Sequence, residues 1–417
     1  MKLAFLVSRF PVLSETFVLN QIAGMLELGH SVDIIAGEPD IGMEFPEIVE
    51  PNRHNLRFIF HAYSQSRLVG LAQGFVRCLR LLPRSPRMVF KAFRPRYHVL
   101  GPSFAIFPVV DSITKSGHAT PIEYDGIVAH FGPNGLLATG LMDLGLIRGP
   151  LTTIFHGFDV TSIPRIFGNG FYRYLFRRGD LFLPVSELWR TRLINLGCPG
   201  DKTVVHRVGI DCNSFEPRKI VNKPQNLKLR LLSVARLVEK KGIKISIEAV
   251  RQLVDDGMQI SYRIAGDGPL MRELQNQVKR LALEPNITFL GRVPNSKIRD
   301  ELSGTDLLIA PSLTAANGDM EGIPVTIMEA MAMEIPVVST RHSGIPELIE
   351  DGLTGYLAQE GDIQSLYQKV KQASEENDKW PALGGSARTR ILEDFNSRIQ
   401  NRKLTELLKT IRERDDC

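Results

Sequence analysis

Two successive runs of alternating strand and helix patterns constrain what this chain of 417 residues can fold into. In the first run, strands are predicted at 3–8, 32–36, 126–129, 151–155 and 181–185, with a helix at 14–28. In the second, strands are predicted at 231–235, 260–265, 287–290, 307–310 and 336–339, and helices near 243–255, 270–282, 296–303 and 324–333. Such alternation is typical of a mostly parallel sheet covered by helices on both faces. We expect an α/β fold with two doubly wound, Rossmann-like domains facing each other across a cleft.

The two runs are separated by a polar stretch, 216–228, that contains two prolines and has neither helical nor strand periodicity. The predicted domains are therefore 1–215 and 229–390. The polar tail from Glu375 has helical character, and its last helix, about 395–417, is a candidate to pack back on the first domain. Ligands of such folds bind beyond the carboxyl ends of the strands, so the loops there are expected to carry the function.

Composition and motifs argue against several classes of protein. The four cysteines include no C-x-x-C pair, which predicts neither a disulfide framework nor a zinc cluster and fits a reducing cytosol. The apolar run 3–7 is too short for a signal peptide, and the stretch around 100–110 is too short to cross a bilayer. Because G-x-x-x-x-G-K-[ST] and G-x-G-x-x-G are both missing from the sequence, ATPase and dinucleotide oxidoreductase functions are not expected.

The basic character of the chain is concentrated in residues 51–110, which hold ten Lys or Arg and no Asp or Glu. Since the whole chain carries a net charge of +5, the remainder carries +5 − 10 = −5. Between arginines of this segment, apolar residues recur at helical spacing: Leu68, Leu71, Ala72, Phe75, Val76, Leu79 and Leu82. An amphipathic basic helix fits an anionic membrane surface, and also fits a helix packed on the core with a solvated face. Nucleic acid is not expected as a partner, because no recognisable nucleic-acid module is present.

Two glutamates eight positions apart, Glu321 and Glu329, flank a Gly322-Ile323-Pro324 turn. Pro324 suits the first position of a helix, whose free first-turn amides and dipole form an anion site. Carboxylates accept hydrogen bonds from hydroxyl groups. A nucleotide sugar fits this pattern, because it carries an anion between two sets of hydroxyls. Either glutamate alone could simply complement the helix dipole.

Cations suited to a diphosphate follow the first strand of the second domain, where "SVARLVEKKG" contains Arg236 and Lys241. Taken alone, such residues are most often merely exposed. Gly266, in "RIAGDGPL", ends the next strand and would allow close approach of the backbone to a ligand. No Asp-x-Asp and no cluster with metal-ligand spacing is present in the sequence, so neither a metal nor another cofactor is expected.

Taken together, these residues make the chain resemble the retaining GT-B glycosyltransferases of glycosyltransferase family 4, which include bacterial exopolysaccharide transferases. The resemblance is strongest over about 230–360, in "SVARLVEKKG", "IAGDGPL", "ITFLGRVPNSKI", "DLLIAPS", "EGIPVTIMEAMAMEIPVVST" and "SGIPELIEDGLTGYL". The segment "EGIPVTIME" matches the family's E-x7-E signature. The first half is similar to colanic-acid-type transferases in "LVSRFPVLSETFVLNQIAGMLELGHSVDIIA", "HFG", "FHGFD" and "LPVSE".

The resemblance implies a role for each candidate residue. Arg236 and Lys241 would hold the donor diphosphate, Glu329 the ribose, and Glu321 with the amides of Gly322 and Ile323 the transferred sugar. His156 matches the family histidine near the reacting carbon of the donor sugar. The remaining candidates are Gly266, Gly291 and Arg292 on the donor side, the last two beside the base, and Arg9, Glu15 and His130 on the acceptor side. The catalytic candidates are His156, Glu321, Lys241 and Arg236.

The chain departs from the family pattern at two places. Many relatives have a glycine-rich loop after the first strand, whereas this chain reads Ser-Arg-Phe-Pro-Val-Leu at 8–13. Glu334 stands where the family usually has glycine after "EAMA", which changes the end of that helix.

The resemblance therefore predicts an enzyme that transfers a sugar, with retention of configuration, from a nucleoside-diphosphate sugar to a hydroxyl of a glycan acceptor. Neither a covalent enzyme nucleophile nor a metal is expected. A polyprenyl-diphosphate-linked acceptor in exopolysaccharide biosynthesis, and a cytoplasmic protein peripheral to the inner face of the membrane, complete the hypothesis. The alternatives are a nucleotide-sugar 2-epimerase of similar architecture and a non-catalytic scaffold.

Overall fold

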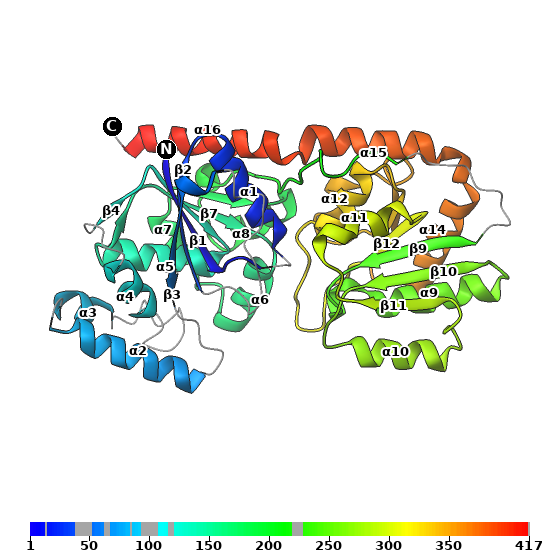
Figure 1. Cartoon of the computed structure of the whole chain (residues 1–417), viewed down its shortest axis with the longest axis horizontal. Helices are drawn as coiled ribbons and strands as arrows, with labels where there is room; N and C mark the ends of the chain where they lie inside the picture. The colour runs from blue at the N-terminus through cyan, green and yellow to red at the C-terminus, as the bar shows by residue number, and fades with distance from the viewer. Residues whose placement is uncertain are drawn as a thin grey trace. The chain divides into compact units, whose positions relative to one another are not determined.

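The computed structural model describes residues 1–12, 15–37, 52–61, 67–83, 86–92, 107–115, 121–218 and 228–415. The chain divides into two compact units (Figure 1). Unit 1 consists of Met1–Arg207 and Gln400–Cys417, and unit 2 of Val208–Ile399. The division at Arg207 precedes the polar stretch in which the sequence analysis placed the boundary, and residues 219–227 of that stretch lie outside the described residues.

Unit 1 is built on a six-stranded parallel sheet with the order β3-β2-β1-β5-β7-β8. Its strands are β1 (Lys2–Arg9), β2 (Ser31–Gly37), β3 (Leu56–His61), β5 (Gly126–His130), β7 (Leu151–Phe155) and β8 (Leu181–Pro184). A separate two-stranded pair consists of β4 (Ile122–Glu123) and β6 (Ile147–Arg148). The chain begins at β1, moves outward to β3 and returns to β5 beside β1. The carboxyl ends of β1 and β5 therefore form the topological switch point, where such sheets bind ligands.

The helices of unit 1 are α1 (Thr16–Glu27), α2 (Arg67–Leu81), α3 (Pro86–Ala92), α4 (Phe107–Lys115), α5 (Gly132–Asp143), α6 (Phe158–Phe167), α7 (Arg173–Arg178) and α8 (Glu187–Asn195). The helix predicted at 14–28 is found as α1, whose apolar face, with Val18, Ile22, Met25 and Leu26, is buried. Its N-cap is Glu15, without a side-chain cap bond. Ser14, the first residue of the helix predicted at 14–28, lies outside the described residues.

Unit 2 repeats the strand order of unit 1, as β11-β10-β9-β12-β13-β14, and all its pairs are parallel. Its strands are β9 (Leu229–Val234), β10 (Ile260–Ala265), β11 (Ile287–Gly291), β12 (Leu307–Ala310), β13 (Val337–Thr340) and β14 (Tyr356–Ala358). Its helices are α9 (Ile243–Asp255), α10 (Met271–Arg280), α11 (Asn295–Ser303), α12 (Val325–Ala332), α13 (Ile345–Leu348), α14 (Ile363–Glu375) and α15 (Trp380–Asp394). The switch point of this sheet lies between β9 and β12.

The core of unit 2 has two parts, one on each face of the sheet. One contains buried residues of α9, α10 and α14, such as Ile247, Leu274 and Val370. The other contains buried residues of α11, α12, α13 and α15, such as Ile327 and Ile391. Helices therefore cover both faces, and the prediction of two Rossmann-like α/β domains with parallel sheets is confirmed.

The last helix, α16 (Ser397–Asp415), belongs to unit 1 from Gln400 onward. Thr405 Oγ1 lies 3.2 Å from His30 Nε2, and Arg412 forms an ion pair of 2.9 Å with Asp125. Gly24 of α1 faces Asn401 so closely that a Cβ there would lie 1.8 Å from the Asn401 amide nitrogen. Among the helices that the structure describes, none has the length and apolar character needed to span a bilayer.

Candidate functional site

The loops at the carboxyl ends of β9 and β12 pack against each other at the switch point of unit 2. The loop after β9 carries Arg236, then a 3-10 turn (Glu239–Lys241). The carbonyl of Lys240 accepts a hydrogen bond of 2.9 Å from the N–H of Leu313. At Gly242, with φ 64°, a Cβ would lie only 1.9 Å from the carbonyl oxygen of Pro311. This position requires glycine both for the left-handed backbone and for the close approach of the two loops.

Glu321 is a buried carboxylate between two lysines. Its Oε2 accepts a hydrogen bond of 2.8 Å from Lys241 Nζ, while its Oε1 lies 3.4 Å from Lys240 Nζ, at ion-pair distance only. Lys240 also contacts Asp319 at 3.0 Å. Burial alone would raise the pKa of Glu321, but the attraction of Lys241 and Lys240 lowers it below the ordinary value. Glu321 is therefore held ionised, with one oxygen short of a hydrogen-bond donor.

The structure thus joins Lys241 and Glu321, which the sequence analysis had singled out separately. Lys240 and Asp319 were missed. Lys240 was missed because only the second lysine of "EKKG" matched the family pattern. The doubled lysine was the signal that could have pointed to it.

The helix α12 begins at Val325, with Pro324 as its N-cap. The expectation that Pro324 would be the first helical residue was therefore wrong by one position, because its ψ of 122° is extended rather than helical. The N–H of Ile327 donates to the carbonyl of Pro324. The amides of Gly322, Ile323, Val325 and Thr326 have no hydrogen-bond partner within the described ranges. Unpaired amides at a helix start form a positive site suited to an anion.

Glu329 lies in the second turn of α12. Burial raises its pKa to about 7, and its carboxylate has no hydrogen-bond partner in the part of the chain that the structure describes. Such a carboxylate gains more than usual from hydroxyl donors, because it has already lost its water.

Arg236 is exposed, and its guanidinium likewise contacts no acceptor among the described residues. The guanidinium of Arg236 and the carboxylate of Glu329 are thus both available to a ligand.

The loops after β9, β10 and β11 are joined through their backbones. The N–H of Gly266 donates to the carbonyl of Gly291 at 2.7 Å, and both glycines have positive φ, 138° and 66°. A Cβ at Gly266 would lie 1.8 Å from the carbonyl oxygen of Ala235. Gly266 is therefore required for the close approach of this turn to the end of β9, and its proposed backbone approach to a ligand stays a prediction. Arg292 is exposed beside this junction.

Three further residues position the main chain of Glu321, and sequence reasoning missed them. The N–H of Glu321 donates to His342 Nε2 at 3.1 Å, and His342 Nδ1 lies 2.9 Å from Glu360 Oε2. Ser343 donates to the carbonyl of Glu321 at 2.6 Å. The sequence feature that could have pointed to His342 and Ser343 is their place in "RHSG", which directly follows β13 at the edge of the sheet where ligands bind.

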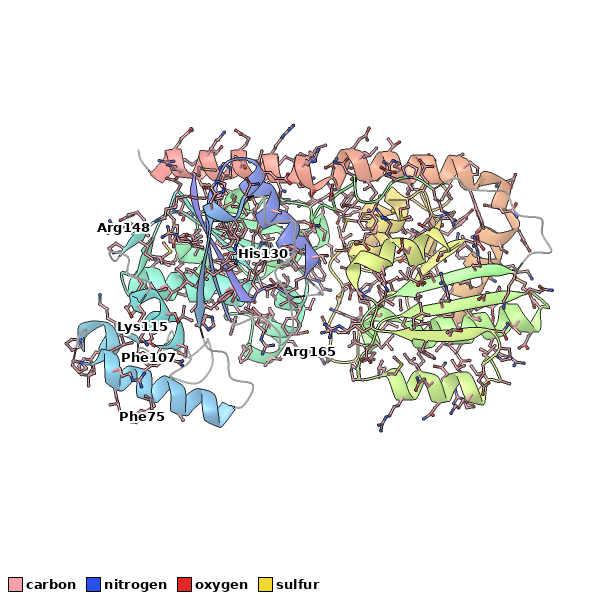
Figure 2. All side chains as sticks on the ribbon, in the orientation of Figure 1. Phe75, Phe107, Lys115, His130, Arg148 and Arg165 are labelled. Atoms are coloured by element: carbon pink, nitrogen blue, oxygen red, sulfur yellow. The ribbon has the colours of Figure 1, made fainter. Side chains whose placement is uncertain are left out.

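In unit 1, His130 ends β5 and His156 follows β7, so that the two rings meet. Their Nδ1 and Nε2 atoms, respectively, are 3.1 Å apart and the rings are stacked. Figure 2 shows His130 within the body of unit 1. Burial, with the nearby His206, lowers the pKa of His130 to about 3, and burial also lowers the pKa of His156 well below its ordinary value. Both rings are therefore neutral at physiological pH.

Asp159 organises the loop that carries His156. Its carboxylate accepts hydrogen bonds from the backbone N–H groups of His156 at 3.0 Å, Gly157 at 2.9 Å and Gly132 at 3.0 Å. Burial raises its pKa to about 6, although these hydrogen bonds oppose the rise. Asp159 thereby ties the ends of β5 and β7 together. The role of this aspartate of "FHGFD" was not predicted from the sequence.

The other acceptor-side candidates belong to the loop after β1. Arg9 ends the strand and Glu15 precedes α1, at the same edge of the sheet as the two histidines. Burial raises the pKa of Glu15 to about 7. Phe17, in the first turn of α1, lies with its ring 4.6 Å from that of His156. Besides Arg9 and Glu15, this edge of unit 1 therefore carries aromatic rings and neutral histidines.

Comparison with known proteins identifies the class. Residues 14–214 match the family described as Glycosyltransferase Family 4, and residues 215–390 match Glycosyl transferases group 1. The chain is 39% identical over 415 residues to WcaL of Salmonella typhimurium, assigned as a colanic acid biosynthesis glycosyltransferase, covering 99% of this chain and 100% of that protein. It is 38% identical over 420 residues to the amylovoran biosynthesis glycosyltransferase AmsK of Erwinia amylovora, with the same coverage. The chain belongs to the GT-B glycosyltransferases of family 4, in the branch of exopolysaccharide biosynthesis.

Solved structures share the fold. HepE of Anabaena, crystallised in complex with UDP, superposes with a TM-score of 0.71 at 21% identity, covering 98% of this chain and 100% of that one. Sucrose-phosphate synthase of Thermosynechococcus elongatus gives 0.73 at 16% identity and 99% coverage of both chains. The family resemblance seen in the sequence is thus confirmed at the level of fold and class.

Proposed function

We propose that the protein transfers a sugar from a nucleoside-diphosphate sugar to a hydroxyl of a lipid-linked glycan acceptor, with retention of anomeric configuration. One observation carries the proposal. A buried, ionised Glu321 contacts Lys241 directly before a helix start whose amides are unpaired within the described residues. This arrangement offers a cation, an acceptor for hydroxyls and an anion site next to one another.

Cleaving the glycosyl–phosphate bond builds negative charge on the departing diphosphate. Lys241, Arg236 and the first-turn amides of α12 are proposed to stabilise that charge. Groups of this kind are already oriented before the reaction, so the loss of one typically costs about 100- to 1,000-fold in rate. Because these donors belong to the chain itself, we propose that transfer needs no metal.

The hydroxyl groups of the donor are assigned to the two glutamates. Glu321 would accept hydrogen bonds from the transferred sugar, with the amides of Gly322 and Ile323, and Glu329 would accept them from the ribose. Gly291 and Arg292 would border the base. His156, neutral because burial lowers its pKa, would contact the sugar near its reacting carbon as a hydrogen-bonding group rather than as a cation.

The donor assay tests this assignment and separates it from the alternatives. Purified protein is incubated with UDP- and GDP-sugars, with and without a polyprenyl-diphosphate-linked acceptor, and the product anomer is determined by NMR. We expect acceptor-dependent transfer with retention. Conversion of the donor in the absence of acceptor would instead indicate a 2-epimerase, and the lack of turnover with every donor would favour a scaffold.

We also propose that unit 1 docks on an anionic membrane through α2 and α3. In the described part of α2, side chains that the sequence grouped on one apolar face point outward: Phe75 and Leu79 are 50% and 51% exposed, and Val76 and, just after the helix, Leu82 are exposed too. The opposite face, with Cys78 and Leu81, is buried. Figure 2 shows Phe75 on the outer side of α2.

Charge around this exposed row suits an anionic surface. Arg80 and Lys91 are exposed, Phe90 of α3 is 72% exposed, and residues 51–110 contain no acidic side chain. Arg77 is instead used internally, since it lies 3.5 Å from Asp111 of α4, against which α2 packs. A helix with an outward apolar row and flanking cations binds at the interface of an anionic bilayer.

Flotation with vesicles tests the docking. We expect the protein to float with vesicles containing phosphatidylglycerol and to remain in the soluble fraction with purely zwitterionic vesicles. The double variant F75S/L79S should lose flotation while keeping its fold, because both side chains are already half exposed. Flotation that is indifferent to lipid charge, or unchanged in the variant, would contradict the proposal.

A further inference from the structure

His342 bridges two groups from different loops of unit 2 and is completely buried. On one side its Nε2 accepts the backbone N–H of Glu321 at 3.1 Å, and on the other its Nδ1 faces Glu360 Oε2 at 2.9 Å. A backbone N–H can only donate, so Nε2 carries the lone pair and the proton belongs on Nδ1. His342 is therefore assigned as a neutral ring that donates to the carboxylate of Glu360.

Glu360 is fixed in its turn. Its other oxygen accepts the backbone N–H of Thr314 at 2.6 Å, in the loop that follows β12. The chain of contacts thus runs from the loop after β12, through Glu360 and His342, and back to Glu321 in that same loop. A carboxylate that orients a histidine fixes both its ring angle and its tautomer.

The carbonyl of Glu321 is held separately, by the hydroxyl of Ser343 at 2.6 Å. Both main-chain polar groups of Glu321 are thus bound by consecutive residues that follow β13. The side chain itself is bound by Lys241. A ligand that displaced Lys241 from the carboxylate would therefore leave the backbone of Glu321 still anchored.

We propose that His342, oriented by Glu360, is a positioning residue that places Glu321 against the transferred sugar. The inference rests on the proposed function of Glu321 and names a residue that acts through it. His342 contacts Glu321 only through the peptide N–H. Its loss therefore leaves the carboxylate of Glu321 chemically intact but shifts its position.

The consequence for catalysis is selective. Without an acceptor the buried N–H of Glu321 is left unpaired, and the turn before α12 relaxes to find another partner. A displacement of about 1 Å in a catalytic group can cost on the order of 100-fold in rate. Arg236, in the loop after β9, and Glu329, in the second turn of α12, are proposed to hold the nucleotide; both lie outside the turn that relaxes and keep their positions. Turnover should fall while affinity for the nucleotide stays close to the wild-type value.

Two substitutions separate the hydrogen bond of His342 to Glu321 from the volume that its ring fills. His342→Leu fills a similar volume but cannot accept a hydrogen bond. His342→Gln carries an amide oxygen at about the place of Nε2 and can accept the N–H of Glu321 again. His30→Leu is the matched control, because His30 is also buried and hydrogen-bonded but lies in unit 1, against Thr405 of α16.

The experiment combines three measurements on the full chain. Hydrogen exchange of the peptide that contains Glu321 reports the contact, calorimetry with UDP and with GDP reports nucleotide binding, and the transfer assay reports turnover. We expect fast exchange, unchanged nucleotide binding and about 100-fold slower turnover in H342L, with recovery of slow exchange and of part of the turnover in H342Q. H30L should lower thermal stability without changing exchange at Glu321.

Slow exchange or normal turnover in H342L would overturn the inference, as would nucleotide affinity that falls in parallel with turnover. If the wild-type protein transfers no sugar, the proposed function fails, whereas the exchange rates of H342L and H342Q still decide whether His342 holds Glu321.

Discussion

The two units of this chain have the same strand order and place different chemistry at the same edge of the sheet. At the switch point of unit 2, Lys240, Lys241 and Glu321 are charged and in contact. At the switch point of unit 1, His130 meets His156, and burial keeps both rings neutral. The fold alone therefore does not decide what an edge binds.

The difference follows from what each edge leaves without a partner. Unit 2 offers amides, a guanidinium and the carboxylate of Glu329 that have no partner within the described ranges, all suited to an anion flanked by hydroxyls. Unit 1 offers stacked rings and neutral nitrogen atoms, suited to an uncharged hydroxyl group and a sugar face. This contrast fits the proposed function, in which unit 2 would bind the phosphorylated donor and unit 1 the acceptor hydroxyl.

The largest expected effect tests the charged edge. Lys241→Ala should reduce turnover by about 100- to 1,000-fold, because it removes a preorganised cation from the departing diphosphate. Lys244→Ala is the matched control, since Lys244 is an exposed lysine nearby that pairs with Glu273 at 3.0 Å. The rate of sugar transfer measures both. Equal rates for K241A and K244A would remove Lys241 from the mechanism.

A smaller effect concerns the pH dependence of nucleotide binding through Glu329. Its pKa is about 7, and the ribose hydroxyls, its proposed partners, donate more strongly to its ionised form. Affinity should therefore rise as the pH increases through about 7, level off above it, and fall by up to about tenfold per pH unit below it. Calorimetry with UDP and GDP at several pH values measures this. Glu329→Gln should bind more weakly and lose that pH dependence, apart from any titration of the nucleotide itself.

The same variant should be more stable than the wild type at alkaline pH. Because the folded pKa of Glu329 is raised from 4.5 to about 7, its contribution to stability is present at low pH and is lost as the pH rises through 7. Glu329→Gln removes the cost of the buried charge, on the order of 1–3 kcal/mol above pH 7. Chemical denaturation at pH 8 and pH 5 compares the two, and a gain that is equal at both would contradict the assignment.

A further prediction concerns the end of α12 and is smaller again. Glu334 has φ 60°, and the N–H of Ile335 donates to the carbonyl of Ala330 at 2.9 Å, which is the hydrogen-bond pattern of a glycine-terminated helix. Glu334→Gly should stabilise the protein by about 1 kcal/mol, because glycine adopts this conformation without strain. Glu334→Ala retains a Cβ and should give no such gain. Thermal unfolding distinguishes them.

The smallest expected change is in the neutral edge of unit 1. Because burial lowers the pKa of His130 to about 3 and that of His156 well below 6.5, neither ring should take up a proton between pH 8 and pH 5. Nitrogen NMR of histidine-labelled protein measures this directly. Titration of either ring near its ordinary value would erase the contrast between the two units.

Much of the fold could be predicted from the sequence because the elements of unit 2 are regular and their apolar spacing is undisturbed. The helix predicted at 243–255 is found as α9 with the same bounds. The strand β14 was not predicted because a strand of three residues is too short to show an alternating pattern of apolar and polar side chains. The strand β3 was missed because its short apolar alternation lies among arginines.

The candidate site was only partly predictable, for a physical reason. Glu321 and Lys241 could be named because a local motif marks each of them. Their contact, the bonds of His342 and the bond between Asp159 and Gly132 join residues brought together by the sheet, and nothing in their local sequence specifies the partner. The outward face of α2 also depends on tertiary packing, since periodicity gives an apolar face but not the direction in which it points.

The pairing of Lys241 with Glu321 also bears on which anions can bind beside it. A lone inorganic phosphate ion could take this lysine only by leaving a buried carboxylate with a single, poorly oriented counter-ion, which is costly. A sugar phosphate brings hydroxyl donors that satisfy the carboxylate as the lysine turns to the phosphate. If Lys241 and Glu321 have the roles proposed above, their ion pair would select against small phosphates and for molecules that carry both an anion and a sugar.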